Sequence, residues 1–497
     1  MSVRRVMGTE TEYGISARGG EYENHAQLSF DVIQAVAQLN PRTQHVRWDY
    51  GSENPVQDAR GYAMPRAHVR SDLLTDSPAL RATNAPQING ARVYVDHAHP
   101  EYSSPEVLTP RDAVTYNRSG DEIMRRALKT SGQQITLYRS NVDGKGASWG
   151  SHENYLVERS VPFEQLATLF TVHAATRQIF TGSGRVGLGQ ASEEPGFQIS
   201  QRADYFTQKV GLQTTFDRPI VNTRDEPHAS GAYRRFHVIV GDANRMDVPE
   251  LLKVGTTSLL FWALEHDANP AAFLESIALA DPVSALHDIS HDLSVTQTYR
   301  TLQGEELSAV QFQLRLRSWV YAVAAATYDT DSRGEPLWPD DDTKEVVALW
   351  TQVLKDLLKV SKASADERLN MTEEAGRLEW LLKWQILESM RRRKTTTWSS
   401  PLLKAMDISW GSLAQSSLWE KVSSRSQRLI SQGEIDTATK NPPEDTRAYT
   451  RGRVLAERPE EVIAVSWDTV TLADGVLHMD DPYTFTAQHK IDSTNRS

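Results

Sequence analysis

The sequence NGARVYVDHAHPEYSSPE occupies residues 89–106 and provides the first evidence for the fold of the chain. Within it, RVYVD alternates between polar and apolar side chains, and a period of two is typical of a β-strand with one face on a core. Val93 and Val95 then face the core, while Arg92, Tyr94 and Asp96 share the opposite face. A cation, a phenol and a carboxylate on one strand face predict the wall of a cleft.

Further carboxylates accompany this face. Glu101 and Glu106 follow Asp96 closely, and Glu10 and Glu12 fall on one side of a strand that we expect within residues 3–16. Two carboxylates side by side repel each other unless a cation or solvent screens them. Hard oxygen ligands from several short segments suit Mg²⁺ with a nucleotide phosphate, so we expect a magnesium site. For Glu10 and Glu12 alone, a solvated strand edge is the alternative.

The composition restricts the class of protein. The 497 residues include no cysteine, and 54 Lys and Arg against 65 Asp and Glu leave a net charge of −11. The absence of cysteine excludes disulfides, cysteine-ligated metals and thiol nucleophiles. The acidic balance disfavours a sequence-independent nucleic-acid binder, and no apolar run approaches the ~20 residues of a membrane span. With no visible secretory signal, we expect a cytoplasmic protein with neither nucleic acid nor membrane as a partner.

Basic side chains gather later in the chain. Arg202 lies in SQRADYF, Arg224 in NTRDEPHA, and Arg235 shares a predicted strand face with His237, while His152 opens another polar strand. Arginines presented from strands suit bidentate binding of phosphate or carboxylate. For any one of them an ordinary surface salt bridge is an equal alternative. Together with the early carboxylates, they predict an anionic ligand held between a metal and guanidinium groups.

The motif GSGRVG at residues 182–187 matches the G-x-G-x-x-G pattern of dinucleotide sites. Such a site needs a strand before the glycines and a helix after them. Here the preceding FTVHAATRQIF has a helical pattern and the following LGQASEEPGF has none. We therefore reject a dinucleotide site and predict a flexible loop.

The sequence indicates two domains of unequal size. Residues 41–88 carry five prolines and little periodicity, which predicts an inserted mobile loop. Residues 305–390 have a helical pattern, and a polar, serine-rich stretch at 411–432 marks a boundary. We predict a catalytic domain over 1–425 and a small C-terminal domain over 426–497.

Several longer motifs carry a family resemblance, among them MGTETEYGIS, NGARVYVDHAHPEYSSPE, EPGFQISQRADY, NTRDEPHA, YRRFHVIVGDAN and NPPEDTRAY. Nearly end to end, the chain resembles the Pup ligase/Dop family, which acts on the prokaryotic ubiquitin-like protein Pup. The resemblance implies an α+β fold: a glutamine synthetase-like curved antiparallel sheet with helices packed behind it, plus a small C-terminal domain. The 41–88 insertion and VDHAHPEYS favour the deamidase and depupylase branch, Dop, whereas WDYGSENP departs from its usual pattern.

The resemblance also implies roles for particular residues. Asp96 would be the catalytic carboxylate, with Mg²⁺ and ATP as cofactors. The other roles are metal contacts for Glu10, Tyr94 and Glu101, with Glu12 a further candidate; nucleotide contacts for Arg92, Ser104 and Trp467; and contacts with phosphate and the C-terminal residue of Pup for Arg202, Arg224, His152 and His237.

The reaction expected from this resemblance is hydrolysis of an amide on a glutamate side chain, with ATP bound but not consumed at each turnover. Pup and pupylated proteins would be the partners. Amide hydrolysis needs an activated nucleophile and stabilisation of an oxyanion, and Asp96 suits either the general base or the nucleophile. ATP-dependent ligation of Pup is the alternative on the same residues, and a non-catalytic regulator is a third.

Overall fold

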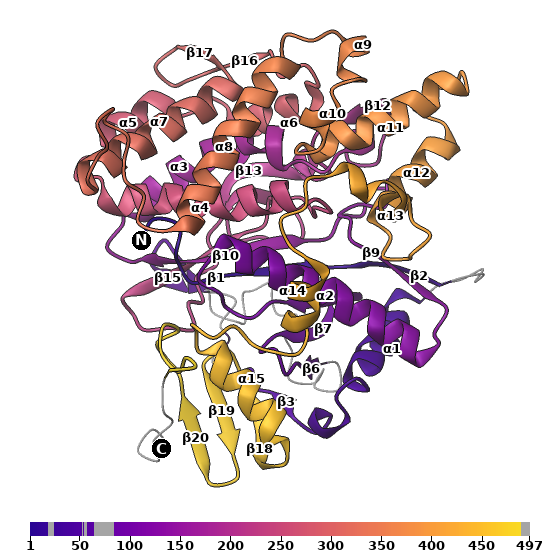
Figure 1. Ribbon diagram of the computed structural model, residues 1–497, viewed down its shortest axis with the longest axis vertical. Coiled ribbons are helices and arrows are strands. Elements are labelled where there is room, and N and C mark those ends of the chain that lie inside the picture. The colour runs from indigo at the N-terminus through magenta and orange to yellow at the C-terminus, as the bar shows by residue number, and fades with distance from the viewer. Residues whose placement is uncertain (18–23, 52, 54–56, 64–83, 489–497) are drawn as a thin grey trace.

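The computed structural model describes residues 1–17, 24–51, 53, 57–63 and 84–488. Its centre is an antiparallel sheet in the order β15–β10–β1–β8–β7–β6 (Figure 1). The strands are β1 (Met7–Glu12), β6 (Asn84–Pro86), β7 (Arg92–Asp96), β8 (His99–Ser103), β10 (Ser151–Glu158) and β15 (Tyr233–Val238). The expected antiparallel sheet is therefore confirmed, and its centre is built from the two stretches that carry the early carboxylates.

Helices cover one face of this sheet, chiefly α2 (Pro110–Ser131), α3 (Phe163–Thr181) and α4 (Asp247–His266). Aromatic rings join the layers: Tyr155 of β10 lies edge-on to Phe261 of α4 with ring centroids 5.5 Å apart, and Phe236 of β15 lies 5.0 Å from Phe170 of α3. Burial of such rings is a large hydrophobic contribution. The opposite face of the sheet is left for polar side chains, as the period of two predicts.

Hydrogen bonds from α2 fix the central strand from behind. The Thr11 hydroxyl donates to Oδ1 of Asn117 at 3.0 Å, and the Tyr13 hydroxyl donates to Oδ1 of Asp121 at 2.8 Å. Because side chains alternate along a strand, anchoring Thr11 to the helix layer points Glu10 and Glu12 to the open face.

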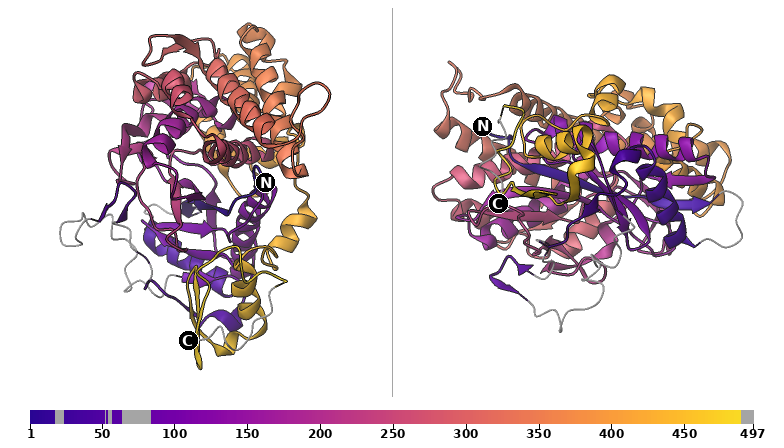
Figure 2. Two further views of the ribbon diagram at one scale, coloured as in Figure 1. Left: turned by 90° about the vertical axis from the view of Figure 1, so that its left-hand side faces the viewer. Right: turned by 90° about the horizontal axis from the view of Figure 1, so that it is seen from below.

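The remaining helices lie mostly beyond α3 and α4, at the end of the molecule opposite the C-terminal strands (Figure 2). They are α1 (His25–Ala37), α5 (Ala271–Ile277), α6 (Pro282–His291), α7 (Ala309–Thr327), α8 (Asp341–Val360), α9 (Ala365–Arg368), α10 (Thr372–Ala375), α11 (Glu379–Arg393), α12 (Pro401–Gly411), α13 (Leu418–Val422), α14 (Gln432–Ala438) and α15 (Ala448–Glu457). Of these, α1 packs on β7 and β8, and α15 lies beside the C-terminal strands. Among the described residues, no helix has the length and apolar content that crossing a bilayer requires.

A smaller sheet near the C-terminus has the order β20–β19–β18–β3. It combines β18 (Val462–Val465), β19 (Thr469–Leu472) and β20 (Gly475–His478) with β3 (Arg47–Trp48), which runs parallel to β18. Val46 and Trp48 are buried in its core. The prediction that residues 41–88 form one inserted loop is thus wrong at both ends, because β3 and β6 belong to sheets. Strands of two or three residues are too short to show a period. Residues 64–83 lie outside the described residues, and the boundary at 425/426 stays a prediction.

Short two-stranded sheets complete the fold: β2 (Gly14–Ala17) with β9 (Ile135–Tyr138), β4 (Gln57–Asp58) with β5 (Tyr62–Ala63), β11 (Arg185–Leu188) with β12 (Glu194–Gln198), β13 (Phe206–Gly211) with β14 (Arg218–Asn222), and β16 (Thr298–Arg300) with β17 (Glu306–Ser308). The GSGRVG motif follows α3 and leads into β11. A dinucleotide site needs a helix after the glycines, and here a strand follows them. The predicted flexible loop is wrong, however, because residues 182–187 are buried.

Candidate active site

A cleft with a volume of about 230 Å³ opens on the polar face of the central sheet. A second cavity of about 100 Å³ adjoins it near the start of β1. The two share the lining residues Glu10, Ser103, His228, Arg235 and Trp467. The open face therefore offers two connected compartments that meet at Glu10.

Three carboxylates meet at one end of the cleft. Glu12, Asp96 and Glu101 come from β1, β7 and β8, and one oxygen of each lies within 4.8 Å of the others. The strand register explains this, because Glu12 pairs directly with Glu101 and Glu101 pairs with Tyr94. We call these three residues the acidic group.

Burial differs within the acidic group. Glu101 is 1% exposed, and burial together with the nearby carboxylates of Asp96, Glu10 and Glu12 raises its pKa well above the usual range. The Asp96 side chain retains 18% exposure, with its Oδ1 2.9 Å from Nδ1 of His97. Asp96 is thus the member of this group most able to reach a substrate, and the group as a whole favours a cation.

A tight turn places Asp96. His97 and Ala98, which join β7 to β8, have φ values of 45° and 72°, a left-handed conformation that non-glycine residues seldom adopt. The Ser29 hydroxyl of α1 donates to the carbonyl of Ala98 at 2.7 Å, and the His99 ring stacks on Trp149 at 4.9 Å. These contacts stabilise the strained turn directly beside Asp96.

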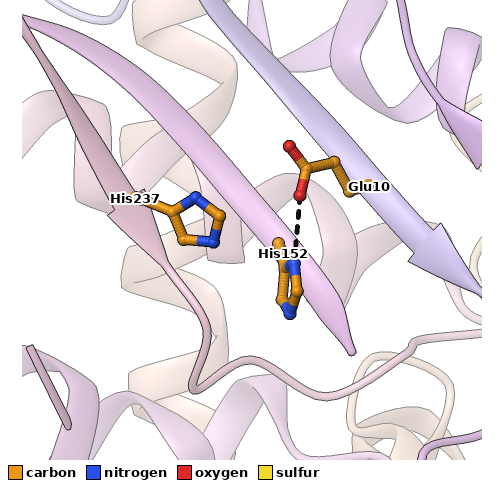
Figure 3. A group of neighbouring side chains, drawn as sticks. All are labelled: Glu10, His152 and His237. Carbon is orange, nitrogen blue, oxygen red and sulfur yellow. Dashed lines mark hydrogen bonds and ion pairs between the residues drawn. The ribbon is translucent and has the colours of Figure 1, made fainter. Parts of the chain in front are cut away.

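A second group contains Glu10, His152 and His237, again with ligand atoms within 4.8 Å of one another; we call it the histidine group (Figure 3). Nδ1 of His152 donates to Oε2 of Glu10 at 3.0 Å, and the two imidazole centroids are 5.1 Å apart. The His237 ring is 3% exposed, yet neither of its nitrogens bonds to a described residue. Unpaired buried nitrogens on the cleft wall indicate a ligand position.

Cations surround Glu10. Nη2 of Arg235 donates to its Oε1 at 3.0 Å, and Nδ2 of Asn154 donates to the same oxygen at 2.9 Å. Burial raises the pKa of Glu10, but the His152 hydrogen bond and the charge of Arg235 outweigh it and hold that pKa well below the usual range. Burial, then the charge of Arg235, lowers the pKa of His237 well below its ordinary value.

Gly150 lets the two groups approach each other. A Cβ at this position would lie 2.2 Å from Nε2 of His152 and 2.7 Å from Oε1 of Glu12. Both distances are shorter than any stable contact, so a larger residue would displace one side chain from each group.

The cleft brings together eleven of the twelve residues given roles from sequence: Asp96, Glu10, Glu12, Tyr94, Glu101, Arg92, Trp467, Arg202, Arg224, His152 and His237. Ser104 lines the second cavity instead, where its hydroxyl accepts from the Thr9 amide at 2.9 Å. The predicted metal contacts Glu10 and Glu101 fall in different groups, and Tyr94 lines the same cleft.

Arg92 has neighbours that the sequence did not indicate. Its guanidinium lies 4.4 Å from the Trp48 ring centroid and 3.9 Å from that of Tyr94, and it pairs with Glu53 at 3.3 Å. Trp48 in turn packs edge-on against Trp467 at 5.0 Å. Trp48 and Glu53 come from the segment expected to be a loop, so no sequence signal linked them to the site.

The donor sets can be tested against a divalent cation. The acidic group offers three carboxylates, which are hard oxygen ligands of the kind that Mg²⁺ takes. Burial, and after it the charges of the neighbouring carboxylates, raise the pKa of Glu101, and a bound cation would offset both effects. The histidine group offers mixed nitrogen and oxygen donors, with both His237 nitrogens unpaired. The residues present therefore fit a metal, and the acidic group fits magnesium better.

Comparison with known proteins agrees with the fold. The family model described as Pup-ligase protein matches residues 5–471. The depupylase of Acidothermus cellulolyticus is 41% identical over 479 residues, 94% of this chain and 91% of its own length. The Pup deamidase/depupylase of Mycolicibacterium smegmatis is also 41% identical with the same coverage. The Pup–protein ligase of Bifidobacterium longum subsp. infantis is 32% identical, covering 91% and 84%.

Two solved structures share the architecture. The crystal structure of Pup in complex with its ligase PafA has a TM-score of 0.77 at 25% identity, covering 99% of this chain and 91% of that one. The structure of PafA with ADP has a TM-score of 0.68 at 25% identity, covering 86% and 93%. Fold and cleft together define an enzyme with the glutamine synthetase-like α+β architecture. Within that class, the chain belongs to the Pup-ligase protein family.

Proposed function

We propose that this enzyme deamidates the C-terminal glutamine of Pup and cleaves the isopeptide bond between Pup and lysine in pupylated proteins, with ATP and Mg²⁺ as cofactors and in the cytoplasm. The observation that carries the proposal is the placement of Asp96, which is accessible at the cleft end of β7 beside two more deeply placed carboxylates. The higher identity to depupylases, 41% against 32% for the ligase, supports hydrolysis over ligation.

The roles proposed from sequence fit the two compartments. We assign the acidic end of the cleft to the amide that is cleaved and the second cavity, lined by Ser104 and Trp467, to the nucleotide. Glu10 and Arg235 lie where the compartments meet, so the phosphates would approach this point. Arg224 and His237 line the cleft from the same side and remain candidates for phosphate contacts.

Hydrolysis of the amide would require few groups from the chain. Asp96 either removes a proton from the attacking water or attacks the amide carbon itself, and both routes need its ionised form. The tight turn and its contact with α1 hold this carboxylate in place. Glu12 and Glu101, with Glu10 and Tyr94 as further candidates, would hold Mg²⁺. When bound, the metal supplies positive charge that stabilises the developing oxyanion.

The test is to incubate the protein with a pupylated substrate, ATP and Mg²⁺ and to follow the release of free Pup. A parallel reaction contains Pup ending in glutamine and is followed by mass spectrometry for conversion of the amide to the acid. We expect both products, and we expect a non-hydrolysable ATP analogue to support them, because amide hydrolysis needs no net phosphoryl transfer.

The ligase alternative predicts the opposite pattern. Ligation forms a conjugate from Pup ending in glutamate and a lysine, and it requires cleavage of ATP. Conjugate formation without Pup release, abolished by the ATP analogue, would overturn the proposed hydrolase.

A further inference from the structure

The helix α12 carries apolar side chains on two opposite faces. Leu403 and Trp410 are buried against the body of the protein. The opposite face is open to solvent, and its residues are also apolar: Pro401, Leu402, Ala405 and Ile408. Leu402 is 42% exposed and Ile408 is 45% exposed. A helix that is apolar all round is normally buried all round, which makes the outer face of α12 a candidate contact surface.

The spacing of these exposed residues defines one continuous surface, which we call the α12 stripe. Pro401, Ala405 and Ile408 follow the i, i+4, i+7 order of a single helix face, and Leu402 lies three residues before Ala405. At the helical rise per residue, the stripe is about 10 Å long, or two turns. Anchors at this spacing are how one amphipathic helix contacts another.

The α12 stripe lies away from the active site. The helices α11 and α12 form a hairpin that projects from the helical end of the molecule (Figure 1). Residues that line the cleft and the second cavity include none of the stripe. A molecule bound to the stripe would therefore leave both compartments open.

The segment around the stripe is basic. Residues 390–421 contain six Lys and Arg but two acids, in a chain whose net charge is −11. Both acids already have a buried cation as partner, because Asp407 pairs with Lys383 at 2.5 Å and Glu420 pairs with Arg245 at 3.2 Å. The surface of this segment is therefore more positive than its composition alone indicates.

Four exposed cations of the segment form no ion pair with a described residue: Arg393, Lys394, Lys404 and Lys421. Arg393 and Lys394 lie at the end of α11, and Lys404 lies on α12 itself. Lys421 lies on α13, which packs against α12. A partner with acidic side chains beside an apolar face would cover the stripe and gain ion pairs around its rim.

We propose that the α12 stripe and these four cations bind an acidic amphipathic helix of another protein. A nucleic acid would pair with the cations but leave the apolar stripe uncovered. A bilayer is disfavoured as well, because even one acyl chain gives only marginal membrane binding and the two large aliphatic side chains of the stripe bury less area. The surface would bring a partner to the enzyme without taking part in the reaction, so the inference does not depend on the proposed function.

The test uses a fluorescein-labelled designed peptide of ~18 residues that forms a helix with leucines along one face and glutamates beside them. Its fluorescence anisotropy is measured as full-length wild-type protein is added at low salt, and we expect saturable binding. Ile408→Asp should weaken this binding ~10-fold or more, because the burial of one large aliphatic side chain is lost. Lys404→Glu should weaken it ~5-fold and make it less sensitive to salt.

Leu337→Asp and Lys355→Glu are the matched controls. Leu337 is 54% exposed and Lys355 is also exposed, but neither belongs to α11, α12 or α13. Both variants should bind the peptide as the wild type does. Because Ile408 is exposed, Ile408→Asp should keep the wild-type Tm, which shows that weaker binding does not come from unfolding.

A second peptide, with lysines in place of the glutamates, should not bind. The inference would be overturned by equal binding of the two peptides, by unchanged binding in Ile408→Asp, or by no saturable binding of the acidic peptide up to about 0.1 mM protein. Tighter binding to phosphatidylglycerol vesicles than to the peptide would assign the surface to a membrane instead. A dimer seen by sedimentation velocity and lost in Ile408→Asp would assign it to a second copy of this chain.

Discussion

The histidine group and the acidic group have similar geometry but opposite electrostatic surroundings. Each gathers three possible ligand atoms within 4.8 Å, and each takes a carboxylate from β1. In the histidine group, Glu10 already has His152 and Arg235 as partners, and its pKa is held well below the usual range. In the acidic group, Glu101 faces other carboxylates, and its pKa is raised well above that range. Side chains of the protein compensate the negative charge of Glu10, whereas the charge of Glu101 is left for a bound cation to compensate.

The strongest way to break this comparison is Asp96→Asn. The substitution keeps the size of the side chain but removes the charge and basicity that either mechanism needs, so amide cleavage should fall ~10²-fold or more. Nucleotide affinity, measured by calorimetry, should stay within about threefold of wild type, since Asp96 lines the cleft and not the second cavity. A variant that retains more than a tenth of the wild-type rate would remove Asp96 from the mechanism.

Glu101→Gln and Glu10→Gln should shift Tm in opposite directions, which would distinguish the acidic group from the histidine group. Both should weaken Mg²⁺-dependent ATP binding, by ~10-fold, because an amide is a poorer ligand for a hard cation. Without Mg²⁺, however, Glu101→Gln relieves repulsion and should raise Tm, whereas Glu10→Gln leaves Arg235 and His152 short of a partner and should lower it. Scanning calorimetry in EDTA tests this. Shifts of the same sign would show that the two carboxylates sit in equivalent surroundings.

Gly150→Ala tests whether the two groups must touch. The added Cβ would collide with His152 of one group and Glu12 of the other, so activity should fall ~10-fold with a smaller loss of stability. Gly231→Ala is a suitable control, because a Cβ there meets nothing within 4 Å. Equal activity of both variants in the pupylated-substrate assay would mean that the close approach at Gly150 is dispensable.

A separate effect concerns the pH dependence of stability at the junction of the two compartments. Burial lowers the pKa of His228 from 6.5 to about 4. The unfolded chain therefore binds more protons between these values, and stability falls as the pH falls through this window, by up to about 3 kcal/mol. His228 has a φ of 44°, which asparagine tolerates. His228→Asn should flatten the decline in urea midpoint from pH 6.5 to 4; an unchanged slope would exclude His228 as its source.

Strand periodicity was enough to predict which side chains share a face. Arg92, Tyr94 and Asp96 do lie together, as do Glu10 and Glu12, because alternation is a local property of one strand. The pairing of Glu10 with His152, or of Glu12 with Glu101, depends on register between distant strands, which one sequence does not reveal.

Other parts of the site could not be predicted from the sequence. Arg218, which also lines the cleft, was not singled out because an isolated arginine in a mixed segment looks like any surface cation. The strand expected over 3–16 divides into β1 and β2, which join different sheets, although the sequence pattern is continuous. Trp48 and Glu53 lie in a proline-rich stretch, and their contacts with Trp467 and Arg92 join residues far apart in the sequence.

The parallel pairing of β3 with β18 has a consequence for biosynthesis. Trp48 and Arg92 leave the ribosome early, but the strand that covers Trp48 and the tryptophan that packs against it, Trp467, are translated only after all strands of the central sheet. Closing so long a loop is slow, and the nascent chain exposes apolar surface until it closes. A chain that ends shortly before residue 462 would therefore contain the whole central sheet but lack the strand and the tryptophan that pack against Trp48. Such a truncated product should be inactive and prone to aggregation, which makes the synthesis of β18 and Trp467 a required step in assembling the site.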